Sequence, residues 1–272
     1  MANQELIINK LLQIRQSVKF KKPLIHYITN PISINDCANV ILSIGAKPIM
    51  AEHPLEVSEI TSASDALGIN LGNITDVRMK SMLISGKTAF KEKIPQVIDL
   101  VGVGCSKLRL NYAKEFISQC HPDVIKGNLS EIKTICGVQS NAKGIDAGEY
   151  DKLTDANIEI MKKLSLKTNS IIAATGAVDV ITNGSETCLI KNGCEMLSMV
   201  TGTGCMVTAL ITSYISSSDI FYGTILAVSL IGICGELSQH VTGIGSFRTA
   251  LIDNLFTISD NTIINEIYLK IL

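Results

Sequence analysis

The chain of 272 residues contains no tryptophan, and aromatic residues make up only 4% of it. Because 46% of the residues are hydrophobic, its core must be built from aliphatic side chains. This share, with only 18% charged residues, excludes an intrinsically disordered chain. A chain of this length can bury most of its apolar surface without disulfides or structural metals. We therefore expect one globular domain that spans residues 1–272.

An excess of charge of one sign is also missing. The chain has 24 Lys and Arg residues against 25 Asp and Glu residues, and no basic stripe or tail stands out. Binding to the phosphate backbone of a nucleic acid requires such a basic surface. The sequence therefore predicts no nucleic-acid partner.

None of the eight cysteines forms a Cys-x-x-Cys pair or has a zinc-like spacing with histidine. They are scattered through apolar stretches, which predicts free thiols in a reducing, cytoplasmic compartment. The N-terminus lacks the charge pattern of a signal peptide. The most apolar stretch, 220–234, is shorter than the roughly 20 residues that a membrane span needs, so we expect a buried core helix and no membrane contact.

Helical and strand patterns alternate along most of the chain. A helical period predicts helices at 3–18, 33–44, 54–63, 76–85, 106–120, 130–135 and 155–166. Short apolar runs predict strands at 24–28, 47–51, 66–71, 97–101, 124–125 and 170–174, and the strands 178–182 and 187–191 flank a hairpin dipeptide, Asn183-Gly184. From about Met206 onward we expect mostly helix. The alternation predicts an α/β fold with a mainly parallel sheet, helices on both faces and an antiparallel edge hairpin.

The strongest local signal is Thr201-Gly202-Thr203-Gly204-Cys205, which precedes an apolar helical stretch. Glycines allow backbone N–H groups to approach a ligand, and a helix N-terminus carries unsatisfied donors and a partial positive charge. This combination suits a phosphoryl group. A glycine turn before a core helix is the structural alternative.

Two further segments place polar residues at the ends of strands. Asp99 lies near the end of an apolar strand and is followed by Gly102 and Gly104. Ligands of open α/β sheets bind beyond the carboxyl ends of strands, although a turn-forming Asp is as plausible. Thr175-Gly176 also ends a strand and could contact a phosphate, but such an ending is common.

A short strand enters the segment Lys126-Gly127-Asn128-Leu129-Ser130-Glu131. Asn128 or Ser130 could cap the helix that follows, and Glu131 lies in its first turn. Asn128 and Glu131 could hold Mg²⁺ directly or through water, since this ion prefers a few carboxylates, waters and phosphate oxygens. Alternatively, Glu131 only complements the helix dipole.

Taken together, these motifs resemble the hydroxyethylthiazole kinases of thiamine salvage, within the ribokinase-like superfamily. The ordered series spans nearly the whole chain, and its order makes it specific. It comprises His26-Tyr27-Ile28-Thr29-Asn30, Gly45 to Ala51, Asp65-Ala66-Leu67, Asn70-Leu71-Gly72, Asp99 with Val101 to Gly104, Gly127-Asn128, Ser130-Glu131, Lys143-Gly144-Ile145-Asp146, Thr175-Gly176 with Asp179, and Val200 to Cys205.

The resemblance implies Mg²⁺-dependent transfer of the γ-phosphoryl group of ATP to the primary hydroxyl of 4-methyl-5-(2-hydroxyethyl)thiazole. It also implies a homotrimer with active sites at subunit interfaces. By match to the family's motifs, Met50 and Gly202 would contact the thiazole, and Asn30 would lie near it. Lys126 and Thr175 would contact ATP, and Asp99 and Glu131 would organise Mg²⁺ and phosphate. Gly202, Gly204 and Cys205 would act in catalysis.

Cys205 occupies the place where related sugar and vitamin kinases carry an aspartate base. A thiolate can accept a proton from an alcohol, and a helix N-terminus favours the thiolate. In the alternative, Cys205 only packs beside the substrate. His26 and His53 are expected to be structural.

The chain departs from the family pattern at two positions. Leu100 follows Asp99 where the family usually has proline, which predicts a looser loop because leucine does not fix φ. Lys126 stands where the family usually has arginine, and lysine offers a point charge without a bidentate fork.

Three other functions are compatible with parts of this pattern. Another ribokinase-like vitamin kinase, such as hydroxymethylpyrimidine kinase, is the nearest, although the Asn30 and Met50 motifs favour the thiazole. An ADP/ATP-dependent dehydratase of hydrated nicotinamide cofactors would be expected to carry Asp in place of Cys205. A non-catalytic nucleotide-binding sensor is opposed by the intact Asp99, Glu131 and Cys205.

Overall fold

A nine-stranded sheet crosses the protein in the order β2-β1-β3-β4-β5-β6-β7-β8-β9 in a computed structural model that describes residues 2–138, 153–217 and 219–272. The elements are α1 (Ala2–Lys21), β1 (Leu24–Ile28), α2 (Ile34–Ser43), β2 (Lys47–Ile49), α3 (Val57–Ser62), β3 (Ala66–Asn70), α4 (Asp76–Glu92), β4 (Gln96–Asp99), α5 (Lys107–Cys120), β5 (Val124–Asn128), α6 (Leu129–Ile135), α7 (Asp155–Thr168), β6 (Ile171–Thr175), β7 (Asp179–Thr182), β8 (Thr187–Ile190), α8 (Met196–Met199), α9 (Thr203–Ile215), α10 (Ile220–Leu237), α11 (Ile244–Thr257), α12 (Asp260–Glu266) and β9 (Leu269–Ile271).

The strands from β2 to β6 pair in parallel, and β6 to β9 pair antiparallel. The Asn183-Gly184 hairpin joins β7 to β8 as predicted. Parallel strands require crossover connections, and helices provide them here. The predicted α/β fold with an antiparallel edge is therefore confirmed.

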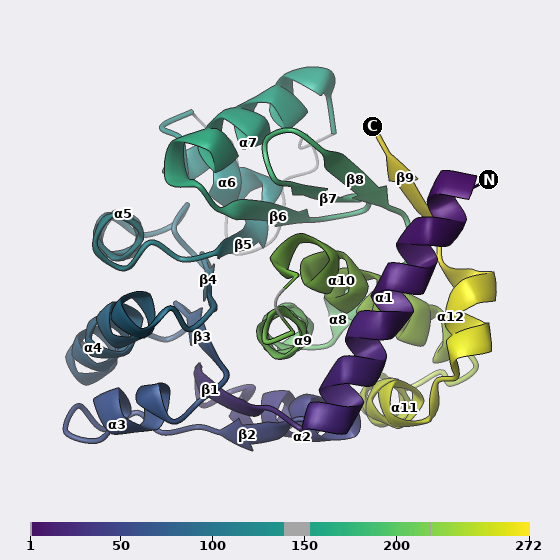
Figure 1. Cartoon of the computed structure of the whole chain (residues 1–272), viewed down its shortest axis with the longest axis horizontal. Coiled ribbons are helices and arrows are strands. Elements are labelled where there is room, and N and C mark those ends of the chain that lie inside the picture. Colours follow the sequence, from purple (N-terminus) through teal and green to yellow (C-terminus); the bar gives the residue numbers. More distant parts are fainter. Residues whose placement is uncertain (1, 139–152, 218) are drawn as a thin grey trace.

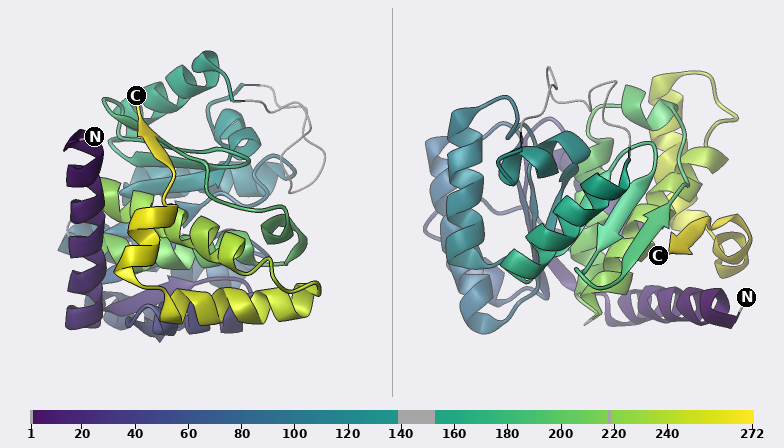
Figure 2. Two further views of the ribbon diagram at one scale, coloured as in Figure 1. Left: turned by 90° about the vertical axis from the view of Figure 1, so that its right-hand side faces the viewer. Right: turned by 90° about the horizontal axis from the view of Figure 1, so that it is seen from above.

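Two apolar cores lie on opposite faces of the sheet because side chains alternate along each strand. One core packs Val97 and Val124 against α1, α2, α9, α10 and α11, and the other packs Ile98 and Ile125 against α4, α5, α6 and α7. Figures 1 and 2 show these two helical layers on either side of the sheet. Helix α9 lies directly against β1, β3 and β4, so its N-terminus is held over that face of the sheet.

One prediction about the elements is wrong. Pro54 does not open a helix: the N–H groups of Glu56 and Val57 both donate to the carbonyl oxygen of His53, and this turn delays the start of α3 until Val57. The prediction of mostly helix after Met206 is confirmed by α9 to α12, and the one addition there is β9, which pairs antiparallel with β8. That pairing joins segments distant in sequence, so local periodicity gives no signal for it.

Helix α10 is long and apolar enough to cross a membrane by composition alone, but 78% of this 18-residue window is buried within the protein. It packs against α9, α1 and α11. Gly223 allows the backbone of Tyr214 at the end of α9 to approach, since an added Cβ would lie 2.9 Å from its carbonyl oxygen. The prediction of a buried core helix is confirmed.

Candidate active site

Polar residues end four neighbouring parallel strands at the carboxyl edge of the sheet. Asn70 ends β3, Asp99 ends β4, Asn128 ends β5 and Thr175 ends β6. The register pairs Asn70 with Asp99, and Asn128 with Thr175. The chain therefore brings together four strand ends that are far apart in sequence.

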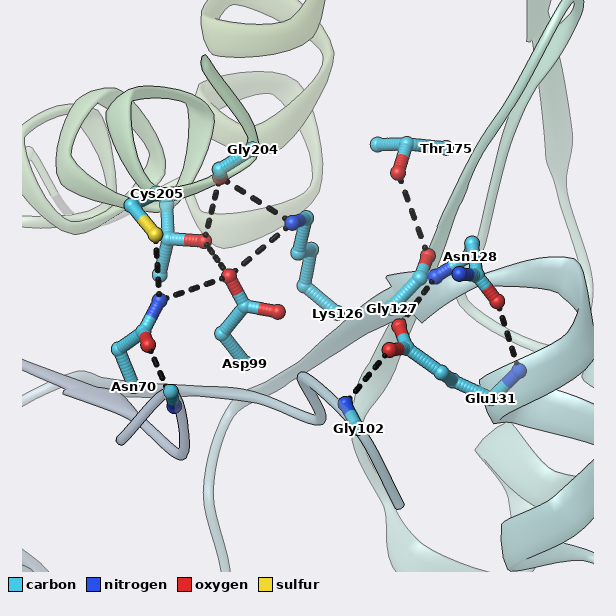
Figure 3. Close-up of polar contacts among 12 residues, drawn as sticks. Asn70, Asp99, Gly102, Lys126, Gly127, Asn128, Glu131, Thr175, Gly204 and Cys205 are labelled. Carbon is cyan, nitrogen blue, oxygen red and sulfur yellow. Dashed lines mark hydrogen bonds and ion pairs between the residues drawn. The ribbon is translucent and has the colours of Figure 1, made fainter. Parts of the chain in front are cut away.

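The alternation of side chains directs part of this set toward α9. Asp99 lies two residues after Val97, and Lys126 lies two residues after Val124, both of which face the core beneath α9. Asp99 and Lys126 are also paired in register. Their side chains therefore meet the first turn of α9, where Gly204 and Cys205 lie (Figure 3).

Asp99 is fully buried, and one of its carboxylate oxygens carries most of the contacts. Oδ2 accepts hydrogen bonds from Asn70 Nδ2 at 3.1 Å and Thr208 Oγ1 at 2.6 Å, and it pairs with Lys126 Nζ at 3.0 Å. Oδ1 has no hydrogen-bond partner among the described residues. A buried carboxylate oxygen without a donor is costly, so this atom suits contact with a cation.

Lys126 is nearly buried, and its ammonium also donates to the carbonyl oxygen of Gly204 at 3.1 Å. Burial alone lowers the pKa of Lys126, but the negative charges of Asp99 and Glu131 more than offset this effect, so the pKa is raised. The side chain therefore remains a cation. It ties the carboxyl edge of the sheet to the glycine-lined start of α9.

The sulfur of Cys205 accepts two amide hydrogen bonds, from Asn30 Nδ2 at 3.3 Å and Asn70 Nδ2 at 3.2 Å. Cys205 itself is 8% exposed, whereas Gly204 beside it is exposed. The start of α9 is therefore open to solvent at Gly204, while the sulfur of Cys205 is held by two buried amide groups. N–H groups directed at sulfur stabilise negative charge there.

Gly202 caps α9 in a left-handed conformation with φ of 93°, which glycine adopts without strain. A Cβ added there would lie 2.8 Å from Cβ of Ser33. Ser33 in turn donates through its N–H and its hydroxyl to Oδ1 of Asn30. The predicted substrate residues Gly202 and Asn30 are thus linked through one side chain.

Glu131 and Asn128 form a capping box at the start of α6, as the sequence allowed. Glu131 Oε2 accepts from the N–H of Asn128, and Oε1 accepts from the N–H of Gly102, both at 2.8 Å. Burial raises the pKa of Glu131 to about 7, and the negative charge of Asp99 raises it further. These two N–H groups and the charge of Lys126 act in the opposite direction. Glu131 thus joins the loop after β4 to α6 and brings a second carboxylate near Asp99.

These residues fit a Mg²⁺ ion held partly by water and phosphate. Within residues 2–138, 153–217 and 219–272, no group of three His, Cys, Asp or Glu side chains could form a metal cage. Mg²⁺ in kinases does not need such a cage, because one or two carboxylates, waters and substrate phosphates complete its octahedron. The unpartnered Oδ1 of Asp99 provides a ligand atom of that kind.

The other predicted contact residues lie at the same edge. Thr175 is half-buried, and its hydroxyl lies 3.5 Å from the carbonyl oxygen of Gly127. Met50 directly follows β2 and packs against the apolar core that contains Cys205. The motif 143–146 lies outside the described residues.

The departure at Leu100 has a local explanation in its backbone hydrogen bond. The N–H of Leu100 donates to the carbonyl oxygen of Lys126 at 2.8 Å, and its side chain is fully buried. Proline has no N–H and could not form this bond. The turn after Asp99 is therefore held by a contact with β5 in place of a fixed φ.

The histidines have the expected structural contacts. Both ring nitrogens of buried His26 are engaged, with Nδ1 2.9 Å from Thr61 Oγ1 and Nε2 2.9 Å from the carbonyl oxygen of Ala51. Burial lowers the pKa of His26. His53 is exposed, and its Nδ1 accepts from the N–H of Leu55.

Sequence reasoning assigned no role to Asn70, Thr208 or Asp179. Asn70 carries the same signal as Asp99, a polar residue at the end of an apolar strand. Asp179 accepts a hydrogen bond from the N–H of Gly176. Burial raises the pKa of Asp179 to about 7, while this N–H and the charge of Lys126 lower it. Nothing in the sequence distinguishes Thr208 from the other hydroxyl residues of α9.

Comparison with known proteins identifies the family. The sequence profile of the hydroxyethylthiazole kinase family matches residues 15–261. The chain belongs to this family. Hydroxyethylthiazole kinase 2 of Clostridium botulinum (strain Langeland) is 72% identical over 260 residues, which cover 94% of this chain and 98% of the relative. A second curated hydroxyethylthiazole kinase, from strain Eklund 17B, is 41% identical over 263 residues, covering 94% and 95%.

Comparison with solved structures shows that the chain has the ribokinase-like fold. The hydroxyethylthiazole kinase protein of Pyrococcus horikoshii OT3 superposes with a TM-score of 0.88 at 30% identity, covering 97% of this chain and 99% of that one. A ribokinase-like superfamily protein from Enterococcus faecalis V583 superposes with a TM-score of 0.65 at 14% identity, covering 87% and 88%, and shares the fold alone.

Proposed function

We propose that this protein transfers the γ-phosphoryl group of ATP to the primary hydroxyl of 4-methyl-5-(2-hydroxyethyl)thiazole, giving the thiazole phosphate for thiamine salvage. Family membership supports this assignment. The observation that carries it is the position of the Asp99–Lys126 pair against the first turn of α9, where Gly204 is open to solvent. Positive charge and helix N–H groups at this point support a role in stabilising a transferring phosphate.

In the proposed reaction, Cys205 as thiolate accepts the proton of the substrate hydroxyl. The alcohol oxygen forms a bond to the γ-phosphorus, and the bond from that phosphorus to the bridging oxygen of ADP breaks, with its electron pair leaving on ADP. Lys126 and the first turn of α9 stabilise the negative charge that spreads over the phosphoryl oxygens. Bound Mg²⁺ would neutralise phosphate charge, held by Asp99 Oδ1 and, through water, by Glu131.

The proposed contacts follow the family pattern. Met50, Gly202 and Asn30 would surround the thiazole, and Lys126 and Thr175 would contact ATP. The link from Gly202 through Ser33 to Asn30 supports a shared substrate wall. We further propose a cytoplasmic homotrimer with active sites at its subunit interfaces, as the family resemblance implies.

A coupled assay of ADP release tests the function. We expect ADP release and a thiazole phosphate, identified by mass spectrometry, with hydroxyethylthiazole and Mg²⁺, and much less of either without Mg²⁺. Hydroxymethylpyrimidine is the matched alcohol control. Faster turnover of the pyrimidine would reassign the substrate, and no turnover of either would contradict the kinase function.

The role of Cys205 has its own test. Cys205→Asp should retain or raise turnover, because a carboxylate can also accept the proton, while Cys205→Ala should lose much of it, by about 10²-fold or more. Unchanged turnover in the alanine variant would remove the base assignment. Binding of ATP, measured by calorimetry, should remain in both variants.

A further inference from the structure

Asn70 contacts both Cys205, the proposed base, and Asp99, the proposed metal ligand. It is fully buried at the end of β3. Its amide nitrogen lies 3.2 Å from the sulfur of Cys205 and 3.1 Å from Oδ2 of Asp99. Figure 3 draws both contacts as dashed lines. A third acceptor, the hydroxyl of Tyr27, is farther away at 3.4 Å. The two N–H bonds of the amide therefore match its two nearest acceptors.

The orientation of the Asn70 amide is fixed by its other end. Oδ1 accepts from the N–H of Gly72 at 2.8 Å, and a backbone N–H can only donate. An ionised carboxylate such as Asp99 can only accept, so the nitrogen must face Asp99. The space is also tight, since a Cβ on Gly72 would lie 2.8 Å from both Asn70 Oδ1 and Asn30 Nδ2.

We propose that Asn70 is a positioning residue for phosphoryl transfer, acting through the sulfur of Cys205. The inference rests on the proposed function. Asn70 and Asn30 each direct an N–H group at the sulfur. A thiolate held in this way keeps a remaining lone pair for the substrate hydroxyl. Asn70 also fixes the sulfur relative to Asp99, and thus relative to the phosphate side of the site.

Thr208 provides the matched control for this assignment. Its hydroxyl donates to the same oxygen of Asp99 as Asn70, at 2.6 Å, and has no contact with the Cys205 sulfur within the described part of the chain. Thr208→Val keeps the branched shape and removes that donor. Asn70→Leu keeps a similar size and removes both donors. The two variants therefore differ in their effect on the sulfur.

Double-mutant cycles with Cys205→Ala separate these roles. We expect Asn70→Leu to lower kcat about 30-fold when Cys205 is present, with KM for the alcohol changed less than about 3-fold, because it loses a hydrogen bond to a charged group. In the Cys205→Ala background the same change should cost only about 3-fold. Thr208→Val should cost the same factor in both backgrounds. Equal losses for Asn70→Leu in both backgrounds would overturn the proposal.

A second readout does not depend on kinase activity. Iodoacetamide alkylates thiolates, and modification of Cys205 can be followed by mass spectrometry of its peptide. At a fixed neutral pH, we expect alkylation of Cys205 to slow about 10-fold in Asn70→Leu and to change less than about 2-fold in Thr208→Val. An unchanged rate in Asn70→Leu would overturn the proposal even if no alcohol is phosphorylated. The absence of kinase activity with slowed alkylation would contradict the proposed function alone.

Two further variants control for folding. Asn70→Asp retains an oxygen for the N–H of Gly72 and replaces Asn70→Leu in the same measurements if the leucine variant does not fold. Gln96→Leu removes a buried amide at the opposite edge of the sheet, where it donates to the carbonyl oxygen of Cys120 at 2.6 Å. It should lower the unfolding temperature without slowing alkylation of Cys205. A matching slowdown in Gln96→Leu would assign the Asn70 effect to general destabilisation.

Discussion

The two edges of the parallel sheet use aspartate in different ways. At the amino edge, Asp65 accepts from the N–H of Leu24 at 2.7 Å and Asp123 accepts from the N–H of Gln96 at 2.8 Å. At the carboxyl edge, Asp99 accepts from side chains of other elements and keeps one oxygen without a partner among the described residues. The amino-edge carboxylates thus accept hydrogen bonds from backbone N–H groups, while Asp99 brings side chains of several elements together.

A cavity does not by itself mark the edge at which the predicted site residues lie. A cavity of about 610 Å³ lies at the amino edge, lined in part by Lys93, His121 and Asp123. Its walls include Phe90, whose ring lies 4.7 Å from that of His121. The feature that marks the carboxyl edge is the convergence of charged and polar side chains on one another. Four predictions, from the largest expected effect to the smallest, test this difference.

Removing the charge at the carboxyl edge should have the largest effect. We expect Asp99→Asn to lower kcat by about 10²–10³-fold, since it removes the charge paired with Lys126 and the proposed metal ligand. The unfolding temperature should fall too, because Lys126 loses its ionic partner. Kinetics are therefore measured where both proteins are folded. Retention of kcat within about 10-fold would show that Asp99 is not central to the site.

The matched change at the amino edge should affect stability alone. Asp123→Ala leaves the N–H of Gln96 without its acceptor and should lower the free energy of unfolding by about 1–3 kcal/mol. The kcat of the folded fraction should equal that of the parent. Urea unfolding and kcat at low temperature measure the two quantities. A loss of kcat comparable to that of Asp99→Asn would remove the distinction between the edges.

The carboxyl-edge half of this contrast could be predicted from the sequence, because strand ends and glycines are local signals. Asp99, Lys126, Glu131 and the segment 201–205 stood out on that basis. The shared contact of Asn70 and Thr208 with Asp99 could not be predicted. It depends on the register of β3 against β4 and on the rotation of α9 over the sheet, and neither is encoded locally. The late start of α3 was missed because a local turn at His53 occupies the residues after Pro54, and β9 was missed because its partner β8 is distant in sequence.

The turn after Asp99 offers a smaller test of the carboxyl edge. Leu100→Pro restores the residue usual in the family but removes the N–H that donates to Lys126. We expect a net loss of about 1 kcal/mol in the free energy of unfolding. Loss of the hydrogen bond destabilises the folded state slightly more than proline stabilises it by restricting the unfolded chain. Leu100→Ala, which keeps the N–H, is the control for loss of the buried side chain. A stabilised proline variant would show that the N–H contributes less than the fixed φ.

The smallest effect concerns pH and His26 at the parallel strand β1. Burial lowers its pKa below the ordinary 6.5, so the unfolded state binds a proton more readily than the folded state. Stability is therefore intact above that value and is lost as the pH falls below it. Between pH 6.5 and 5.5 we expect the parent to lose more unfolding free energy than His26→Gln, by at most about 1 kcal/mol. Equal pH slopes for both proteins in urea unfolding would refute the assignment.

Helix α10 carries a consequence for handling the protein. Its apolar window is shielded by α1, α9 and α11, and Phe221 to Cys234 are almost all buried. Any local unfolding that detaches these neighbours exposes an aggregation-prone apolar segment, because residues 220–235 contain no charged side chain. Heat inactivation should then end in precipitation, and the useful lifetime of the enzyme should depend on how fast this helix is uncovered.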